Sequence, residues 1–141
     1  MVSYSEIIEK PIDIVWEHFI YKVDYPQYFV PGVSNVLIKE KNESFTVREM
    51  DITSPEGVTH RVIEKITYAP YHVIFNIIDH PLYRGHVDNF AEKISDTQTK
   101  ITFCLNWIDK KTGDSFNNES IAKHAVLKTI DYILKAKLTN L

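Results

Sequence analysis

The chain is poor in the residues that define several protein classes. Its only cysteine is Cys104, which excludes an intrachain disulfide framework and a cysteine-rich zinc site. It has four glycines and six prolines, none of them clustered. The sequence therefore offers no obvious interdomain linker and no glycine-rich loop to hold a phosphate group.

Long apolar runs and a strong charge of one sign are also missing. The most apolar stretch, residues 73–78 (VIFNII), has six residues, whereas a membrane-spanning helix needs about 20. Residues 1–6 (MVSYSE) have neither the basic nor the apolar region of a signal peptide. The net charge is −3, which gives no general attraction to nucleic acid. We therefore expect a cytoplasmic protein without an integral membrane segment or a nucleic-acid partner.

What is present is globular composition. The 141 residues are 44% hydrophobic, 25% charged and 12% aromatic. A chain of this size buries roughly 68–70% of the surface that its unfolded form exposes, enough for a core of its own. We therefore expect residues 1–141 to form a single domain.

The hydrophobic period changes along the chain from strand to helix, back to strand and back to helix. A short strand at residues 2–9 precedes Pro11, which suits the first turn of a helix. Helical spacing then predicts a helix to about residue 20 and a second short helix near 21–28. Six strand-like runs follow, at residues 33–41, 44–53, 58–68, 72–79, 83–95 and 100–109. Asn118 can cap a final helix over about 119–139.

Three sequence motifs carry a family resemblance. They are residues 10–16 (KPIDIVW), 23–33 (VDYPQYFVPGV) and 99–103 (TKITF). Together with the element order, they resemble the START/birch-pollen-allergen-like superfamily, with its polyketide cyclase and coenzyme Q-binding branches. The resemblance implies an α+β helix-grip fold, in which a curved seven-stranded antiparallel sheet surrounds the C-terminal helix and two short helices follow strand 1. It also implies an apolar cavity between sheet and helix.

Strand alternation and the helical stripe predict the residues that line this cavity. Residues 101, 103, 105 and 107 share one strand face, and the long helix turns Val126 and Ile130 towards the sheet. The predicted ligand-binding residues are Phe75, Ile77, His86, Asp88, Phe90, Phe103, Leu105, Trp107, Val126 and Ile130. For any one of the apolar residues, the alternative is that it only fills the core.

Three polar residues are weak candidates for catalysis. Phe90 and Ile94 select a strand phase that turns His86 and Asp88 into the interior, unless a bulge resets the phase or the strand end lies in solvent. Glu64 shares a strand face with Val62 and Ile66. A buried carboxylate can act as a general base. The alternative for Glu64 is a structural ion pair with Arg48 or Arg61.

The histidines do not have the spacing of a metal site. All six lie apart, with no HxH pair and no HExxH motif. We expect no metal and no cofactor. Three functions stay open: a binding or carrier domain for an apolar or amphipathic small molecule (lipid, quinone or polyketide-like), a polyketide cyclase/dehydratase-type enzyme, and a protein-interaction domain of the chaperone-activator type. Binding is favoured, in a monomer or homodimer.

Overall fold

The computed structural model describes residues 1–136 of the chain. Seven strands, two α-helices and one 3-10 turn (η1) follow one another in the predicted order. They are β1 (Val2–Ile8), α1 (Ile12–Asp24), η1 (Pro26–Tyr28), β2 (Val33–Lys41), β3 (Phe45–Thr53), β4 (Thr59–Ala69), β5 (His72–Asp79), β6 (Tyr83–Lys93), β7 (Thr99–Asp109) and α2 (Glu119–Lys135).

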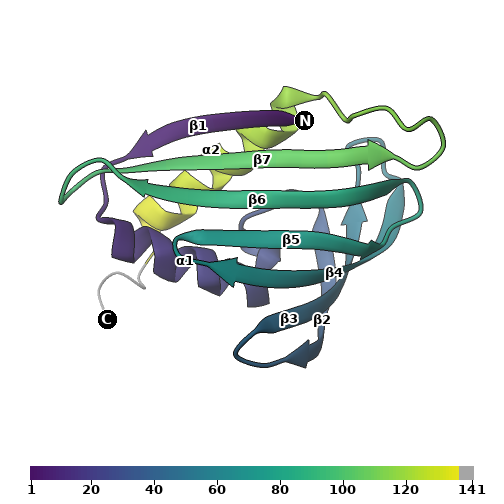
Figure 1. The fold of residues 1–141 in the computed structure, drawn as a ribbon, viewed down its shortest axis with the longest axis horizontal. Coiled ribbons are helices and arrows are strands. Elements are labelled where there is room, and N and C mark those ends of the chain that lie inside the picture. The colour runs from purple at the N-terminus through teal and green to yellow at the C-terminus, as the bar shows by residue number, and fades with distance from the viewer. Residues whose placement is uncertain (137–141) are drawn as a thin grey trace.

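All seven strands form one antiparallel sheet in the order β1-β7-β6-β5-β4-β3-β2. β2 to β7 follow one another through short connections, whereas β1 lies at the far edge beside β7. Both helices cover the same face of the sheet, and α2 runs obliquely behind β7 and β6 (Figure 1). We call the face covered by the helices the inner face and the opposite one the outer face. This is the predicted α+β helix-grip architecture.

The helices start where the sequence predicts. Pro11 precedes the first residue of α1, and the side chain of Asn118 caps α2 by accepting a hydrogen bond from the Ser120 N–H at 3.2 Å. Their ends differ from prediction. α1 continues past residue 20 to Asp24, so that only the single turn of η1 remains of the second short helix. α2 ends at Lys135, and the last three residues of the predicted helix, 137–139, lie outside the described part.

The inner face holds the core. Ile101 and Phe103 of β7 are buried against Phe19 of α1 and Val126 of α2. The Phe19 and Phe103 rings meet edge to face, with 5.9 Å between centroids. Because side chains alternate between faces along each strand, this core fixes which residues of every neighbouring strand point inward.

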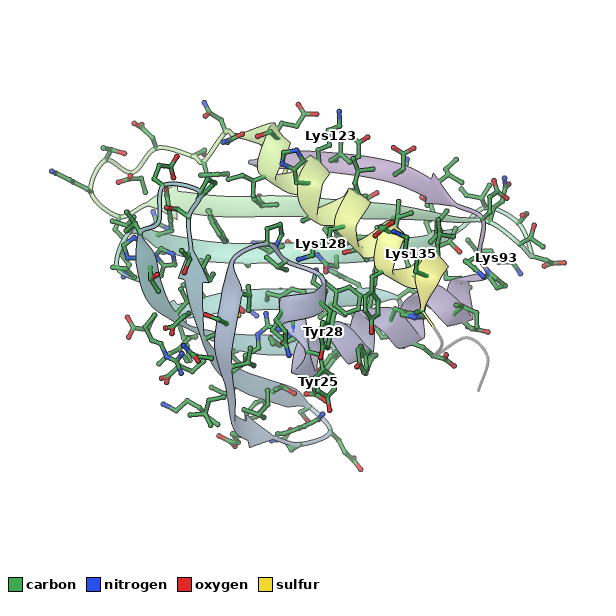
Figure 2. All side chains as sticks on the ribbon, turned by 180° about the vertical axis from the view of Figure 1, so that it is seen from behind. Tyr25, Tyr28, Lys93, Lys123, Lys128 and Lys135 are labelled. Carbon is green, nitrogen blue, oxygen red and sulfur yellow. The ribbon has the colours of Figure 1, made fainter. Side chains whose placement is uncertain are left out.

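Stacked tyrosines join α1 and η1 to α2. Tyr132 of α2 stacks on Tyr28, with 5.9 Å between centroids, and on Tyr21 at 6.2 Å. Tyr25 stacks on Tyr21 at 4.5 Å. Tyr25 and Tyr28 lie side by side at the corner where α1 meets η1 (Figure 2), and their outer edges reach solvent. These aromatic contacts hold the two helices together at one end of the inner face.

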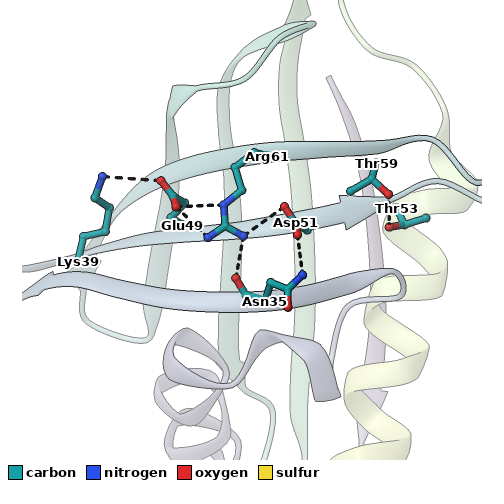
Figure 3. Close-up of polar contacts among 7 residues, drawn as sticks. All are labelled: Asn35, Lys39, Glu49, Asp51, Thr53, Thr59 and Arg61. Atoms are coloured by element: carbon teal, nitrogen blue, oxygen red, sulfur yellow. Dashed lines mark hydrogen bonds and ion pairs between the residues drawn. The ribbon is translucent and has the colours of Figure 1, made fainter.

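A polar network on the outer face compensates an irregularity in β2. The β2–β3 register shifts between Ser34 and Leu37, and Asn35 takes the left-handed conformation (φ 51°). Arg61 donates to the Asn35 carbonyl oxygen at 2.8 Å and to Glu49 Oε2 at 3.0 and 2.8 Å (Figure 3). The Asn35 amide donates to Asp51 at 2.8 Å. The bulge is thus hydrogen-bonded on the outer face.

Gly85 of β6 allows a close backbone approach to β7. Its φ is +116°, and a Cβ there would lie 2.0 Å from the Asn106 carbonyl oxygen. We expect Gly85→Ala to lower the free energy of unfolding by about 1–3 kcal/mol from backbone strain, and further from the clash. Gly57→Ala is the control, because Gly57 also has a positive φ (+85°) but has open space around it. Urea unfolding measures both; equal losses would show that the approach of the strands is unimportant.

Candidate ligand-binding site

Except for Phe90, the apolar residues predicted to bind a ligand lie on the inner face of the sheet or on α2, which covers that face. The β6–β7 and β5–β6 registers place Trp107 beside Gly85 and Gly85 beside Ile77. The members of the predicted set on this face are Phe75, Ile77, Phe103, Leu105, Trp107, Val126 and Ile130. Ile77, Trp107 and Ile130 are only partly buried, so solvent reaches part of this face.

β6 has the opposite phase to the predicted one. Its inner residues are Val87, Asn89 and Ala91, which pair with inner residues of β7. His86, Asp88 and Phe90 therefore point to the outer face, which corrects the predicted orientation. No bulge lies in this strand pair. The sequence argument failed because it placed Phe90 inside, whereas the Phe90 ring stacks on His72 outside, with 4.0 Å between centroids.

The misplaced polar residues form a cluster of their own on the outer face. The nearly buried Asp88 accepts hydrogen bonds from His72 Nε2 at 2.7 Å and from His86 Nδ1 at 2.6 Å. Cys104 lies beside Asp88 in the register, and burial, with a smaller effect from this carboxylate, raises the pKa of its thiol. His86 and Asp88 meet as a pair, but the sheet separates them from Glu64.

Four polar side chains meet instead on the inner face. They form what we call the inner polar cluster, Lys22, Arg48, Glu64 and Asn89, and each is at least 94% buried. Arg48 donates to Glu64 Oε1 from Nη2 at 2.6 Å and from Nε at 3.2 Å. Of the two partners that the sequence allowed for Glu64, the structure selects Arg48, in the interior of the protein.

Arg48 also binds the end of α1. Its Nη1 donates to the carbonyl oxygens of Val23 at 2.9 Å and Lys22 at 3.3 Å. The last carbonyl groups of a helix have no partner within the helix, and a cation there interacts favourably with the helix dipole. The guanidinium thus connects β3, β4 and α1.

Lys22 is the most unusual member of the cluster. Its Nζ donates to Asn89 Oδ1 at 2.7 Å and lies 4.2 Å from the centroid of the Phe103 ring. The pKa of Lys22 is lowered from 10.5 to about 7, mainly by burial and also by the nearby positive charge of Arg48, while Glu64 partly opposes the shift. An amine of this kind changes its charge near neutral pH.

Sequence reasoning missed Lys22 and Asn89. Lys22 has a detectable signal, since it follows Val15 and Phe19 at helical spacing on the buried stripe of α1. Asn89 has none, because its position depends on the phase of β6. Their contact joins residues 67 positions apart, which only the tertiary structure brings together.

Two buried hydrogen-bond donors near this face have no partner in the described structure. They are Asn89 Nδ2 and Trp107 Nε1. An unpaired buried donor costs roughly 1–3 kcal/mol, so native proteins rarely keep one without a reason. Both donors belong to the side of the sheet that faces the helices, and one is part of the inner polar cluster.

Aromatic rings surround Trp107 at the end of β7. The Trp107 ring stacks on Tyr83, with 5.4 Å between centroids, and meets Phe116 at 5.5 Å. An open hollow of about 390 Å³ lies beside these rings, between the end of β7 and the start of α2. Its lining residues are Tyr83, Asp109, Thr112, Asp114, Ser115, Phe116, Asn117 and Asn118.

Within residues 1–136, no three histidine, cysteine or acidic side chains come together in a way that could hold a metal ion. In the same part of the chain, no helix is both long and apolar enough to span a membrane.

Residues 13–139 match a family model described as acetylaranotin biosynthesis cluster protein L, or AtaL. The chain belongs to the AtaL family. A comparison with curated protein sequences finds no significant match.

Solved structures of other proteins share the fold of this AtaL family member. The Zhui aromatase/cyclase from Streptomyces sp. R1128 is 16% identical with a TM-score of 0.69, over 98% of this chain and 88% of that one. A START superfamily protein from Mycobacterium smegmatis is 14% identical with a TM-score of 0.68, over 99% and 97%. Ara h 8.0201 is 14% identical with a TM-score of 0.65, over 95% and 98%. These structures share the fold that the START/birch-pollen-allergen-like resemblance implied, so the predicted fold is confirmed.

The Arg48–Glu64 pair gives a stability prediction for this AtaL family member. Glu64→Gln keeps the size of the side chain but leaves Arg48 buried without a counter-charge, and we expect a loss of about 3–5 kcal/mol in the free energy of unfolding. Glu49→Gln is the control. It disrupts the partly exposed pair with Arg61 and should cost no more than about 1 kcal/mol. Similar urea midpoints for the two variants would contradict the structural role of Arg48.

Lys22 gives a prediction about pH. The pKa of Lys22 is about 7 in the folded protein, whereas 10.5 is the value for an exposed lysine, as in the unfolded chain. Between pH 7 and 10.5 the unfolded chain therefore binds more protons than the folded protein. The free energy of unfolding should therefore rise with pH from about 7 to 10, by up to about 1.4 kcal/mol per unit from this group. Lys22→Met should remove this contribution. Urea unfolding of both proteins between pH 6.5 and 10 measures the difference; parallel curves would show that Lys22 has an ordinary pKa.

Proposed function

We propose that the chain is a single-domain binding protein for an apolar or amphipathic small molecule, which lies between α2 and the inner face of the sheet. The observation that carries this proposal is that the inner polar cluster lies beside apolar side chains of the inner face, which we call the apolar wall (Phe75, Ile77, Phe103, Leu105 and Trp107). Within the cluster, Asn89 Nδ2 has no hydrogen-bond acceptor in the described structure. A ligand with an apolar body and one polar group is complementary to such a surface.

Stability alone does not explain the cluster. Burying a lysine among Phe75 and Phe103 costs free energy that apolar residues of the same volume would not cost. Groups with a strongly shifted pKa are concentrated in functional sites. The location of Lys22 on the inner face, against the Phe75 and Phe103 rings, therefore supports a binding role.

The family and the shared fold support a ligand of the polyketide, quinone or lipid class. The description of the matched family names a protein of the acetylaranotin biosynthesis cluster, and the Zhui protein is described as an aromatase/cyclase. For this chain, the inner polar cluster of Lys22, Arg48, Glu64 and Asn89 offers polar groups to a ligand inside. His86 and Asp88 lie outside, which weakens the cyclase/dehydratase alternative built on them.

The setting that we propose follows from the sequence. A net charge of −3 disfavours nucleic acid as a partner. We propose that the protein acts in the cytoplasm, as a monomer or homodimer and without a bound cofactor.

A larger side chain on the inner face should take up space that the ligand needs and weaken ligand binding. Ile77→Trp adds bulk to a partly buried position of the proposed apolar wall, and we expect the affinity for an uncharged dye such as Nile red to fall about tenfold, which is about 1.4 kcal/mol. Ile74→Trp on the outer face of the same strand is the control and should leave affinity unchanged. Fluorescence titration measures both. Equal affinities of the wild type and both variants, or no dye binding at all, would overturn the proposed site.

Native mass spectrometry of freshly purified protein is the complementary measurement. We expect a co-purified apolar compound, released on unfolding in acid, because a ligand-binding face with unpaired donors is more stable when occupied.

A further inference from the structure

We infer that the ligand is an apolar acid, whose anionic oxygen (a carboxylate or an enolate) is held by Lys22 Nζ and Asn89 Nδ2. This inference rests on the proposed function and adds the chemical class of the polar group.

The charges of the inner polar cluster do not balance. Lys22 and Arg48 contribute two cationic groups, and Glu64 contributes one carboxylate. Arg48 has the carboxylate as its direct partner, in addition to two carbonyl oxygens of α1. Lys22 has only the neutral oxygen of Asn89 among the hydrogen-bond partners that the described structure records. When protonated, it therefore has no counter-charge in direct contact.

Glu64 is close enough to oppose the pKa shift of Lys22, but no carboxylate is recorded in direct contact with its amine in the described structure. β5 and β7 place the Phe75 and Phe103 rings against Nζ, at 5.3 and 4.2 Å from the centroids. β6 contributes the neutral Asn89, and β3 and β4 contribute Arg48 and Glu64, which bind each other. An anion brought by a ligand would complete the set.

Two donors are placed to receive that anion. An ammonium group has three N–H bonds, and one of them is used on Asn89 Oδ1. The unpaired Nδ2 belongs to the same amide, so it lies next to the oxygen that Nζ contacts. One ligand oxygen can therefore accept from both groups, and a charge-assisted hydrogen bond is stronger than a neutral one.

The arrangement discriminates between ligand classes. An anion stabilises the protonated form of Lys22, whereas an alcohol offers no charge and an amine is repelled. Because Lys22 has a pKa of about 7 in the free protein, an anion that binds at pH 8 should also draw a proton onto it.

The test compares decanoate, 1-decanol and decylamine, which share one chain and differ only at the end group. Each displaces Nile red at pH 7. We expect decanoate to displace the dye at about tenfold lower concentration than 1-decanol, and decylamine to be the weakest. In Lys22→Met, decanoate should lose this advantage and displace the dye at the same concentration as 1-decanol, each compared within the variant. Lys65→Met, which removes an exposed lysine of β4 on the outer face, is the control and should behave like the wild type.

Calorimetry in two buffers of different ionisation enthalpy counts protons directly. At pH 8 we expect the wild type to take up close to one proton on binding decanoate, and Lys22→Met to take up none. Two results would overturn the inference: equal displacement of the dye by decanoate and 1-decanol, or a decanoate advantage that persists in Lys22→Met. In both cases, binding of Nile red to the wild type would still support the proposed function. Failure of Nile red to bind the wild type would overturn the proposed function itself.

Discussion

The guanidinium group of Arg48 holds the interior together. It is 98% buried, neutralised by Glu64 and hydrogen-bonded to the last carbonyl groups of α1. A buried arginine is tolerable only when both its charge and its N–H groups have partners. The strand pair β3–β4 supplies the carboxylate and α1 supplies the carbonyl oxygens. Arg48 therefore fixes the C-terminal end of α1 on the sheet, in addition to the apolar packing of Phe19.

The position of α1 determines that of Lys22. Because Arg48 binds the carbonyl groups at the end of the helix, the last turn is held against Phe75 and Phe103, and the Lys22 side chain is buried there. Its lowered pKa is a consequence of that enclosure. A structural ion pair and a chemically unusual amine are thus parts of a single arrangement, in which the first forces the second.

The two faces of the sheet use polar residues differently. The outer face pairs Arg61 with Glu49, and Asp88 with His72 and His86, in hydrogen bonds between protein side chains. The inner face keeps donors without partners. Since the helix-grip fold recurs in proteins less than 20% identical to this one, the fold does not decide this difference; the inward-pointing side chains do.

The sequence by itself determined the architecture. Changes of hydrophobic period mark every strand within a few residues, and Pro11 and Asn118 mark the starts of the helices, because these are local signals. The alternation along β7 also placed Phe103 inward correctly. The local pattern is sufficient to predict the buried face of a strand wherever apolar residues occupy only one of its two faces.

Only the tertiary structure decided the polar part of the site. In β6 both phases contain apolar and polar residues, so alternation could not choose between Asp88 and Asn89 as the inward residue. Which residue points inward depends on how β6 pairs with β7 and on whether the buried side chain finds a hydrogen-bond partner. The partner of Asn89 is Lys22 of α1, which is distant in the sequence. Hydrogen bonds across 67 residues have no local signature, and the burial that shifts the pKa of Lys22 exists only once both helices have packed on the sheet.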